Sequence, residues 1–549
     1  GAARAPSPVA KRMGGDGAVP RPSVNNAPAL AAKHAFVIEF DSDWTVTGGL
    51  AEKALLLSIQ GLANAAAPKG SPVLYSLFPA DWDYTYTGTV MDFYARNKSF
   101  GFEHLSGAKD AIKEVPHGAT KFVVWDTSVR ESLAVAYTIA GVEKALVVSE
   151  ALMELAEASG LTLAVDLRGK FTGKDPTSIY EWAWTNYGAR TSREVIIFLG
   201  GSCHSNWPHA VADWGVASSA FFSDLNTRPE GGSERALAEH ILSNQKPYTL
   251  VMGWHSYCKD LERTFTTLAS SFGLRVEGLH TLPNLSFSSK VEVTPGFQFK
   301  NNHRPPPAPG TIKPKTYMAC VQTDSLGLGA WIQPGRGAIP YAWETPINYL
   351  ELAPAMLEFY YGNATSNDLF IGAISGPGYM YPKAVPKDKL PHIITMARQM
   401  SEKLDIDVFE TMDDSHGSTV IGNTDLTKEV TQAYFDGMPE FRGFIHGYAP
   451  SFTFASSKDG RAFVSFDYYL DPERSEEESA ADLLELAALN NPNNDKPYWC
   501  LLHVREWSDI TRVERILARL PSSTFELLHL DEFLSLAARA PTFEPHFAP

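Results

Sequence analysis

Hydrophobic and polar residues follow two alternating patterns from residue 34 onward. Short apolar runs such as 35–40 and 121–125 are typical of buried strands, and longer runs with helical spacing, such as 50–65 and 129–140, lie between them. Strands that alternate with helices predict a mostly parallel sheet. We therefore expect residues 34–300 to form an N-terminal α/β region, with room for two subdomains.

The stretch NNHRPPPAPGTIKPK, residues 301–315, interrupts this pattern. It is polar and rich in proline, which favours an extended linker between domains. Residues 1–33 are rich in Ala, Pro and Gly and show no periodicity, so we expect them to be disordered or extended. The linker is the clearest predicted domain boundary in the chain.

Strand-like runs recur after the linker, with helical patterns between most of them. Strands followed by helices over residues 316–540 predict a C-terminal (β/α)8-like barrel. The connection 449–461 is short and polar, so we expect an irregular or incompletely closed barrel. The eight runs are residues 316–323, 338–343, 369–375, 405–412, 443–448, 462–468, 498–504 and 525–530.

The composition of the chain limits the classes of function that the protein can have. The 549 residues exceed what one core supports, so several domains are expected. A net charge of −16 without a basic patch argues against nucleic acid as a partner. No run approaches the roughly 20 apolar residues of a membrane span. The 12 Trp and 21 Tyr residues suit a protein that stacks on sugars, although large cores use them too. The oligomeric state stays open.

Cofactor motifs are absent from the sequence. No GxGxxG or Walker pattern accompanies the strands, and the four cysteines are too widely spaced for a metal site. Asp41 and Asp43 fit a turn better than a metal-binding DxD, and adjacent Cys203 and His204 would point apart in a strand. We therefore predict neither a cofactor nor a metal.

Three sequons favour a secreted or extracellular glycoprotein. They begin at Asn97, Asn284 and Asn363, and three such triplets in a chain of this length can also arise by chance.

Acidic residues gather at the predicted C-terminal ends of the barrel strands, where barrel enzymes carry their chemistry. Such residues can also cap the following helix, which is the simpler interpretation for Asp531 and is open for Asp324. Asp413 and Asp414 are adjacent, so only one is expected to face the mouth. The candidate catalytic carboxyl groups are Asp413, Asp414, Glu506, Glu344 and Asp324.

Aromatic residues and one histidine accompany these acids. Sugar rings stack on aromatic faces, and glycosidic cleavage uses two carboxyl groups, one with a raised pKa. A mouth of this composition resembles a carbohydrate site, so we expect a carbohydrate ligand. The candidate substrate-binding residues are Tyr379, Tyr381, Trp343, His416, Tyr448, Tyr468 and Trp507.

The stretch SGPGYMYP, residues 375–382, follows the third predicted barrel strand. Its glycines allow a tight turn, and its prolines fix φ and make the loop stiff. Tyr379 and Tyr381 would lie on one side of an extended segment. The loop is predicted either to form a pocket wall or to be a rigid structural turn.

Residues 376–382, GPGYMYP, match the GxGYxYP signature at every fixed position. The chain therefore resembles the GxGYxYP family of putative glycoside hydrolases. Segments 57–64 (LSIQGLAN), 125–128 (WDTS), 165–169 (VDLRG) and 363–368 (NATSND) are similar to other parts of the family. The resemblance covers roughly residues 35–535.

The resemblance implies an N-terminal α/β domain, a C-terminal barrel-like domain and sugar processing. It assigns no catalytic residues. Family members often carry an acidic cluster of the type DGDN after the first barrel strand, whereas this chain has DSLG at 324–327. Only the first acid is retained.

Three functions remain open at this point. The leading hypothesis is a glycoside hydrolase that acts on a poly- or oligosaccharide. The alternative is a non-catalytic carbohydrate-binding or structural extracellular protein on a degenerate glycosidase scaffold, which the altered acidic stretch favours. A sugar deacetylase or related metal hydrolase ranks last, because the chain has no HxxxH or HExxH spacing.

Overall fold

The computed structural model describes residues 33–80, 86–199, 205–253, 259–278, 282–417, 424–448, 451–505 and 508–549. The described chain divides into two compact units. The N-terminal unit runs to Gly296 and includes Tyr349–Leu357, and the C-terminal unit contains Phe297–Asn348 and Glu358–Pro549. The predictions for residues 1–32 and for Cys203 and His204 lie outside the described residues.

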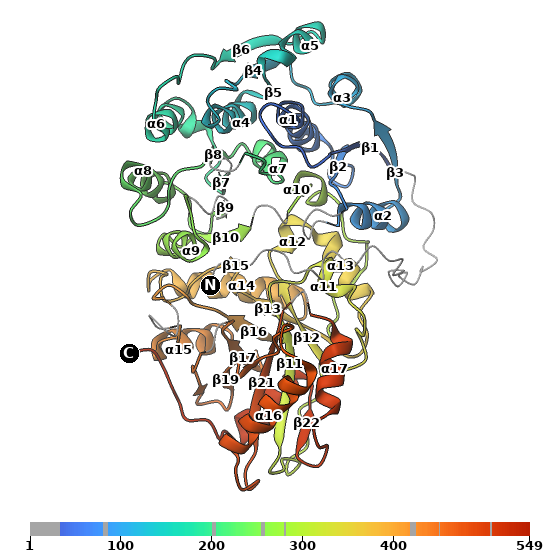
Figure 1. Cartoon of the computed structure of the whole chain (residues 1–549), viewed down its shortest axis with the longest axis vertical. Helices are drawn as coiled ribbons and strands as arrows, with labels where there is room; N and C mark the ends of the chain where they lie inside the picture. The colour runs from blue at the N-terminus through green and yellow to red at the C-terminus, as the bar shows by residue number, and fades with distance from the viewer. Residues whose placement is uncertain are drawn as a thin grey trace. The chain divides into compact units, whose positions relative to one another are not determined.

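The N-terminal unit contains parallel strands in three groups (Figure 1). The first has the order β2-β1-β3, the second β5-β4-β6, and the third contains β10-β9-β7-β8. The predicted α/β region with parallel sheets is therefore present. The strands are β1 (Lys33–Glu39), β2 (Leu74–Leu77), β3 (Phe100–Leu105), β4 (Lys121–Val124), β5 (Ala145–Val148), β6 (Thr162–Asp166), β7 (Val195–Phe198), β8 (Phe221–Ser223), β9 (Leu250–Gly253) and β10 (Arg275–Gly278).

Helices connect these strands. None of the helices in the described residues, in either unit, is long and apolar enough to cross a membrane. The helices of this unit are α1 (Leu50–Ala66), α2 (Thr87–Asn97), α3 (Ala108–Glu114), α4 (Glu131–Glu143), α5 (Met153–Ala158), α6 (Pro176–Tyr187), α7 (Ala212–Ala217), α8 (Gly232–Ser243), α9 (Glu262–Ser271), α10 (Leu285–Ser288) and α12 (Tyr349–Leu352).

Helix α1 is buried along most of its length and carries the motif QGLAN. A side-chain carbon at Gly61 would lie 2.6 Å from the carbonyl oxygen of Asp213 in α7, so glycine permits the close contact between these two helices. The Asn64 amide accepts a hydrogen bond from Val73 N (2.8 Å) and donates one to Leu74 O (2.9 Å). The motif therefore fastens the start of β2 to α1, which is a structural role.

The C-terminal unit is built on one curled sheet whose main strands are parallel (Figure 1). Its strand order is β18-β19-β17-β16-β13-β12-β11-β21-β20, and β22 pairs with β11 off this path. The strands are β11 (Thr316–Gln322), β12 (Tyr341–Pro346), β13 (Asp368–Ala373), β16 (Val408–Thr411), β17 (Gly443–His446), β18 (Ala455–Ser456), β19 (Ala462–Ser465), β20 (Tyr468–Tyr469), β21 (Tyr498–Val504) and β22 (Phe525–Leu527), with the short hairpin β14 (Ser375–Gly376) and β15 (Gly378–Tyr379) after β13.

Helices follow most strands of this unit, and several begin at capping side chains. Thr427 accepts from Val430 N at the start of α15, and Ser475 accepts from Glu478 N at the start of α16. The helices are α11 (Leu328–Trp331), α14 (Leu390–Lys403), α15 (Lys428–Gly437), α16 (Glu476–Asn490), α17 (Ile510–Ala518) and α18 (Leu530–Arg539), while α13 (Pro354–Gly362) is divided between the two units.

The strand order does not confirm the expected (β/α)8 barrel. In such a barrel the eighth strand lies between the seventh and the first. Here β21 pairs directly with β11 along all of Thr316–Gln322, which occupies one edge of β11. Strand β22 pairs only with Thr316–Met318, and β12 pairs with the last two residues of β11. The fold is therefore a curled, half-barrel sheet.

The first residues of the proline-rich segment are fixed to the C-terminal unit. The Asn301 side chain donates to Phe370 O (2.7 Å) and accepts from Phe370 N (2.9 Å), so it pairs with β13 as a strand residue would. Asn301 N also donates to Asp405 Oδ2 (2.9 Å). The predicted linker therefore begins as a docked segment.

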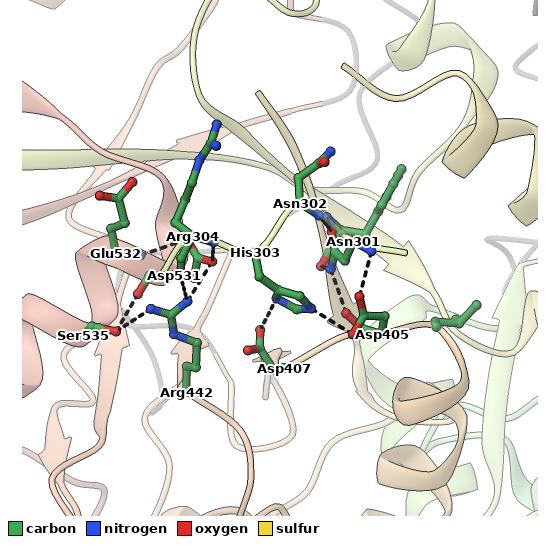
Figure 2. Close-up of polar contacts among 12 residues, drawn as sticks. Asn301, Asn302, His303, Arg304, Asp405, Asp407, Arg442, Asp531, Glu532 and Ser535 are labelled. Atoms are coloured by element: carbon green, nitrogen blue, oxygen red, sulfur yellow. Dashed lines mark hydrogen bonds and ion pairs between the residues drawn. The ribbon is translucent and has the colours of Figure 1, made fainter. Parts of the chain in front are cut away.

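Charged side chains continue this attachment at the N-terminal ends of β16 and β17. Figure 2 shows His303 between two carboxylates, with Nε2 3.0 Å from Asp405 Oδ1 and Nδ1 3.3 Å from Asp407 Oδ1. Beside it, Asp531 Oδ2 accepts from Arg304 N (2.7 Å) and pairs with Arg442 Nη1 (2.9 Å). We call residues 301–304 with these partners the linker clamp.

The linker clamp predicts a pH-dependent stability. Hydrogen bonding to Asp407, followed by its charge and the contacts of Asp405, raises the pKa of His303 from 6.5 to about 9. Because the folded state holds this proton more tightly, the stabilisation is complete below about pH 6.5 and is lost as the pH rises through about 9. Replacing His303 by Gln should lower Tm by roughly 2–6 °C at pH 6, equivalent to about 1–2 kcal/mol, and by less at pH 9.5.

Scanning calorimetry of the full chain at several pH values measures this difference. His34→Gln is the control, because His34 pairs with Glu103 at an exposed site. An equal loss of Tm at pH 6 and pH 9.5 for His303→Gln would show that the ion pairs do not stabilise the clamp.

Candidate active site

The face of the sheet that packs into the apolar core becomes polar at its C-terminal end. Successive side chains of a strand alternate between faces, so residues two apart share a face. The core contains Val321, Ala342 and Val408 from three strands. The next residues on the same face are Thr323 after Val321, Glu344 after Ala342, and Glu410 after Val408.

Glu344 is fully buried and well hydrogen-bonded. The Tyr448 hydroxyl contacts both of its carboxyl oxygens, and Ser325 N donates to Oε1 (2.9 Å). Such donors stabilise an ionised carboxylate. Burial, and then the charge of Asp324, act in the opposite direction and raise the pKa of Glu344 to about 7.

Glu410 is also fully buried, but neither of its oxygens has a donor among the described residues. Burial raises its pKa well above the ordinary value, and the charge of Glu344 beside it raises it further. A proton on Glu410 can form a hydrogen bond with Glu344, which relieves the repulsion between the two carboxyl groups. We call these two residues the carboxyl pair; above about pH 7 it holds one proton, preferentially on Glu410.

Asp324 lies directly after β11 and is partly exposed. Asp324 and Ser325 both have positive φ (66° and 67°), a conformation that turns the chain sharply and directs Ser325 N toward Glu344. Asp324 N donates to the Tyr448 hydroxyl (3.3 Å), and Asp324 Oδ2 is 3.8 Å from Arg505 Nε. Burial raises the pKa of Asp324, while the Arg505 charge lowers it. The turn therefore carries a third carboxyl group beside the pair.

His503 supports this arrangement from β21. Its Nε2 lies 2.7 Å from Thr323 Oγ1, and its ring centroid is 5.7 Å from that of Tyr448 and 5.0 Å from that of Phe466. Burial, followed by the charge of Arg505, lowers the pKa of His503 to about 3. The histidine is therefore neutral and packs against the phenol that contacts Glu344.

The structure places three of the predicted site residues together and adds one that the sequence reasoning missed. Glu344, Asp324 and Tyr448 are in direct contact or joined through one turn. Glu410 was missed because it lies inside a strand, whereas only residues after the strands were considered. Its signal was a charged residue two positions after Val408 in an apolar run. Glu506 and Trp507 lie outside the described residues.

Asp413 is buried in a loop rather than beside the carboxyl pair. It accepts from Lys383 N (2.7 Å) and Ser415 N (3.0 Å), and burial raises its pKa. These contacts connect the loop after β16 to the end of the signature segment. Asp414 is partly buried, and His416 is exposed in the same loop.

The two signature tyrosines are packed against each other. Tyr381 is fully buried, Tyr379 is 8% exposed, and their hydroxyl oxygens are 2.7 Å apart. Ser375 has a φ of 65°, and its Oγ contacts both the O and N of Met412. The loop is hydrogen-bonded to Met412, and its phenols face protein rather than an open surface.

Trp343 and Tyr468 are engaged away from the carboxyl pair. Trp343 precedes Glu344 and therefore faces the opposite side of the sheet, where it is fully buried and its indole donates to Asp368 (2.9 Å). The Tyr468 hydroxyl donates to Asp482 Oδ2 (2.5 Å). The structure brings neither residue to the site around Glu344.

Within the ranges that the structure describes, no group of three or more His, Cys, Asp or Glu side chains is arranged to hold a metal ion. The carboxyl groups of the site can supply acid–base or nucleophilic chemistry. A neutral carboxyl can donate a proton, and an ionised one can accept a proton or act as a nucleophile.

These features define an α/β protein with coupled carboxyl groups at the C-terminal edge of a curled parallel sheet. Residues 314–538 match the model of the GxGYxYP putative glycoside hydrolase C-terminal domain. Residues 119–191 match the GxGYxYP_N second domain, and residues 194–290 match the GxGYxYP third domain. The chain belongs to the GxGYxYP family.

A solved structure has the same fold. It is the crystal structure of a putative hydrolase from Bacteroides thetaiotaomicron, with a TM-score of 0.73 and 17% sequence identity. The similarity covers 93% of this chain and 95% of that one. The comparison with curated proteins gave no match.

The carboxyl pair predicts a stability that falls as the pH rises. Unfolded glutamates lose their proton near pH 4.5, whereas folded Glu344 keeps its proton up to about pH 7. The contribution of the pair to folding is therefore largest below pH 4.5 and declines as the pH rises through about 7. Glu410→Gln keeps the shape of the side chain but removes one of the two acids. The Tm of the variant minus the Tm of the wild type should therefore be more positive at pH 8 than at pH 4.5, by roughly 2–6 °C.

Calorimetry at the two pH values measures the effect, and Glu440→Gln at an exposed position serves as the matched control. If Glu410→Gln shifts Tm equally at both pH values, the two carboxyl groups are not coupled.

Proposed function

We propose that the C-terminal unit is a glycoside hydrolase that acts on a poly- or oligosaccharide. The observation that carries this proposal is the carboxyl pair, in which one member is neutral and the other is held ionised by Tyr448 and Ser325. Glycosidases use two carboxyl groups in these two states, roughly 5 Å or more apart on either side of the scissile bond, so the two members of the pair must separate when a sugar enters. The name of the family agrees with the proposal, as does the naming of the Bacteroides protein as a putative hydrolase.

The contacts suggest a role for each acid. Glu410 is the proton donor to the departing sugar oxygen, because no donor among the described residues contacts it and because it keeps its proton. Glu344 is the ionised partner, which acts as base or nucleophile, because the Tyr448 hydroxyl and Ser325 N stabilise its charge. We assign substrate contact to Asp324, which lies beside Arg505 and is more exposed than either member of the pair.

A second candidate, a carbohydrate-binding protein without catalysis, also has support. Glu344 and Glu410 are both fully buried, so a sugar can reach them only if the surrounding side chains move. Asp324 is followed by Ser-Leu-Gly where family members often have further acids. In this case the chain would bind glycans without cleaving them.

The sequons support a secreted glycoprotein unequally. Asn284 is buried and hydrogen-bonded to Gln60 and Ser76, so a glycan cannot be attached to it in the folded chain. The Asn363 side chain accepts from Arg336 Nη2 (2.9 Å). Asn97 is exposed at the end of α2 and is the position where we propose attachment in a secreted form.

Removal of either acid should abolish most of the activity. We expect Glu410→Gln and Glu344→Gln to lower kcat by about 10²- to 10⁴-fold, the usual contribution of a positioned acid or base. Asp324→Asn should have a smaller effect that appears mainly in KM. Products released from a panel of neutral, acidic and amino-sugar oligosaccharides are measured by chromatography.

Glu440→Gln controls for a general effect of charge removal. Wild-type binding of an oligosaccharide without product release would favour the non-catalytic alternative. Hydrolysis that is unaffected in both glutamate variants would place the active site elsewhere.

A further inference from the structure

The N-terminal unit contains a small polar cavity that the proposed hydrolysis does not use. It lies at the carboxyl ends of the adjacent parallel strands β7 and β8, beside the first turn of α4. Its lining includes Arg130, Tyr180, His209 and Asp224. Open α/β sheets commonly bind ligands in this position, outside the carboxyl ends of their strands.

Arg130 is unusual because, within the described residues, no carboxylate forms a direct ion pair with it, although the charges of Asp224 and Glu131 act on it from nearby. The residue is half-buried at the start of α4, and its guanidinium makes no hydrogen bond or ion pair within the described part of the chain; Nη2 in particular is buried without a partner. Buried arginines are normally paired with an anion. Burial lowers the pKa of Arg130 by more than the nearby Tyr137, Asp224 and Glu131 raise it.

His209 supplies a second unpaired group at the same cavity. It is 2% exposed, and its Nε2 has no partner among the described residues. Its Nδ1 is 3.0 Å from the hydroxyl of Tyr137, which is fully buried. If the phenol donates this bond, as its proton requires an acceptor, the histidine proton is on Nε2. Burial and the Arg130 charge lower the pKa of His209, so the ring is neutral.

Two N–H donors therefore line one cavity without an acceptor among the described residues. The nearby acid Asp224 does not serve them, because it accepts from the Tyr180 hydroxyl (2.6 Å) and lies 3.7 Å from Lys259 Nζ. The start of α4 adds a partial positive charge. Glu131 also lines the cavity and limits the negative charge that a ligand can bring.

We propose that this cavity is a binding site for a carboxylate monoanion, such as the carboxyl group of an acidic sugar, held by Arg130 and His209. The cavity volume is about 10 Å³, which admits one oxygen atom rather than a whole molecule. The ligand therefore inserts one carboxylate oxygen and leaves the remainder outside. This site belongs to the N-terminal unit and does not depend on the hydrolytic activity.

The test measures binding to the full chain by calorimetric titration and by the shift in Tm, with glucuronate, inorganic phosphate and glucose as probes. Glucuronate should bind saturably to the wild-type chain and raise its Tm. Arg130→Gln should weaken that binding by about tenfold or more, because it removes a charge-assisted hydrogen bond. Arg96→Gln is the matched control, since Arg96 is exposed and paired with Asp92.

A second measurement separates a binding role from a structural one. Without ligand, Arg130→Gln should leave Tm unchanged or raise it, because it removes an unpaired buried charge. A large loss of Tm would mean that Arg130 is structural and would overturn the proposal. Equal binding of glucose, binding of phosphate alone, or no saturable effect of glucuronate would overturn it as well, the last result indicating that the cavity holds only water.

Discussion

Two carboxyl groups that are buried side by side cannot both be ionised without a large cost, and this constraint organises the C-terminal unit. Repulsion in a medium of low dielectric constant is much stronger than in water. The pair Glu344 and Glu410 satisfies the constraint with one proton, and its surroundings decide where that proton resides. Tyr448 and Ser325 donate to Glu344, while no residue that the structure describes donates to Glu410, so the two chemically identical side chains have different roles.

The position of the pair depends on the register of the sheet. Glu344 and Glu410 come from β12 and β16, which are separated by β13 in the strand order. The apolar core beneath them includes residues of α18, and the linker clamp joins the segments before β16 and β17 to the same helix through Asp531. A shift of one residue in β12 or β16 would move an acid to the other face. The clamp and the core are therefore part of what holds the site.

Much of this organisation could be predicted from the sequence. The alternation of strands and helices indicated the α/β class, and the strand ends indicated Glu344, Asp324 and Tyr448. Glu410 is harder to predict, because its strand has the pattern of a short apolar run. It could be found only by asking which face of that strand each residue lies on. The same rule of alternation would have excluded Trp343, since adjacent residues of a strand face opposite sides.

Other features depend on contacts between distant segments, which local patterns do not encode. The direct pairing of β21 with β11, and the displacement of β22 to the other edge, follow from long-range packing. Tyr379 and Tyr381 have the spacing expected of two rings on one side of a pocket wall, but both rings are buried in the protein interior. Asp413 has the expected chemistry, yet main-chain donors from Lys383 and Ser415 use its oxygens.

The most direct test of the central claim is a crystal structure of the Glu410→Gln chain with a bound oligosaccharide. The account predicts that the glycosidic oxygen lies about 3 Å from the side chain of residue 410 and that the neighbouring anomeric carbon faces Glu344. A sugar that is bound elsewhere on the C-terminal unit, with both members of the carboxyl pair still covered by protein, would contradict it.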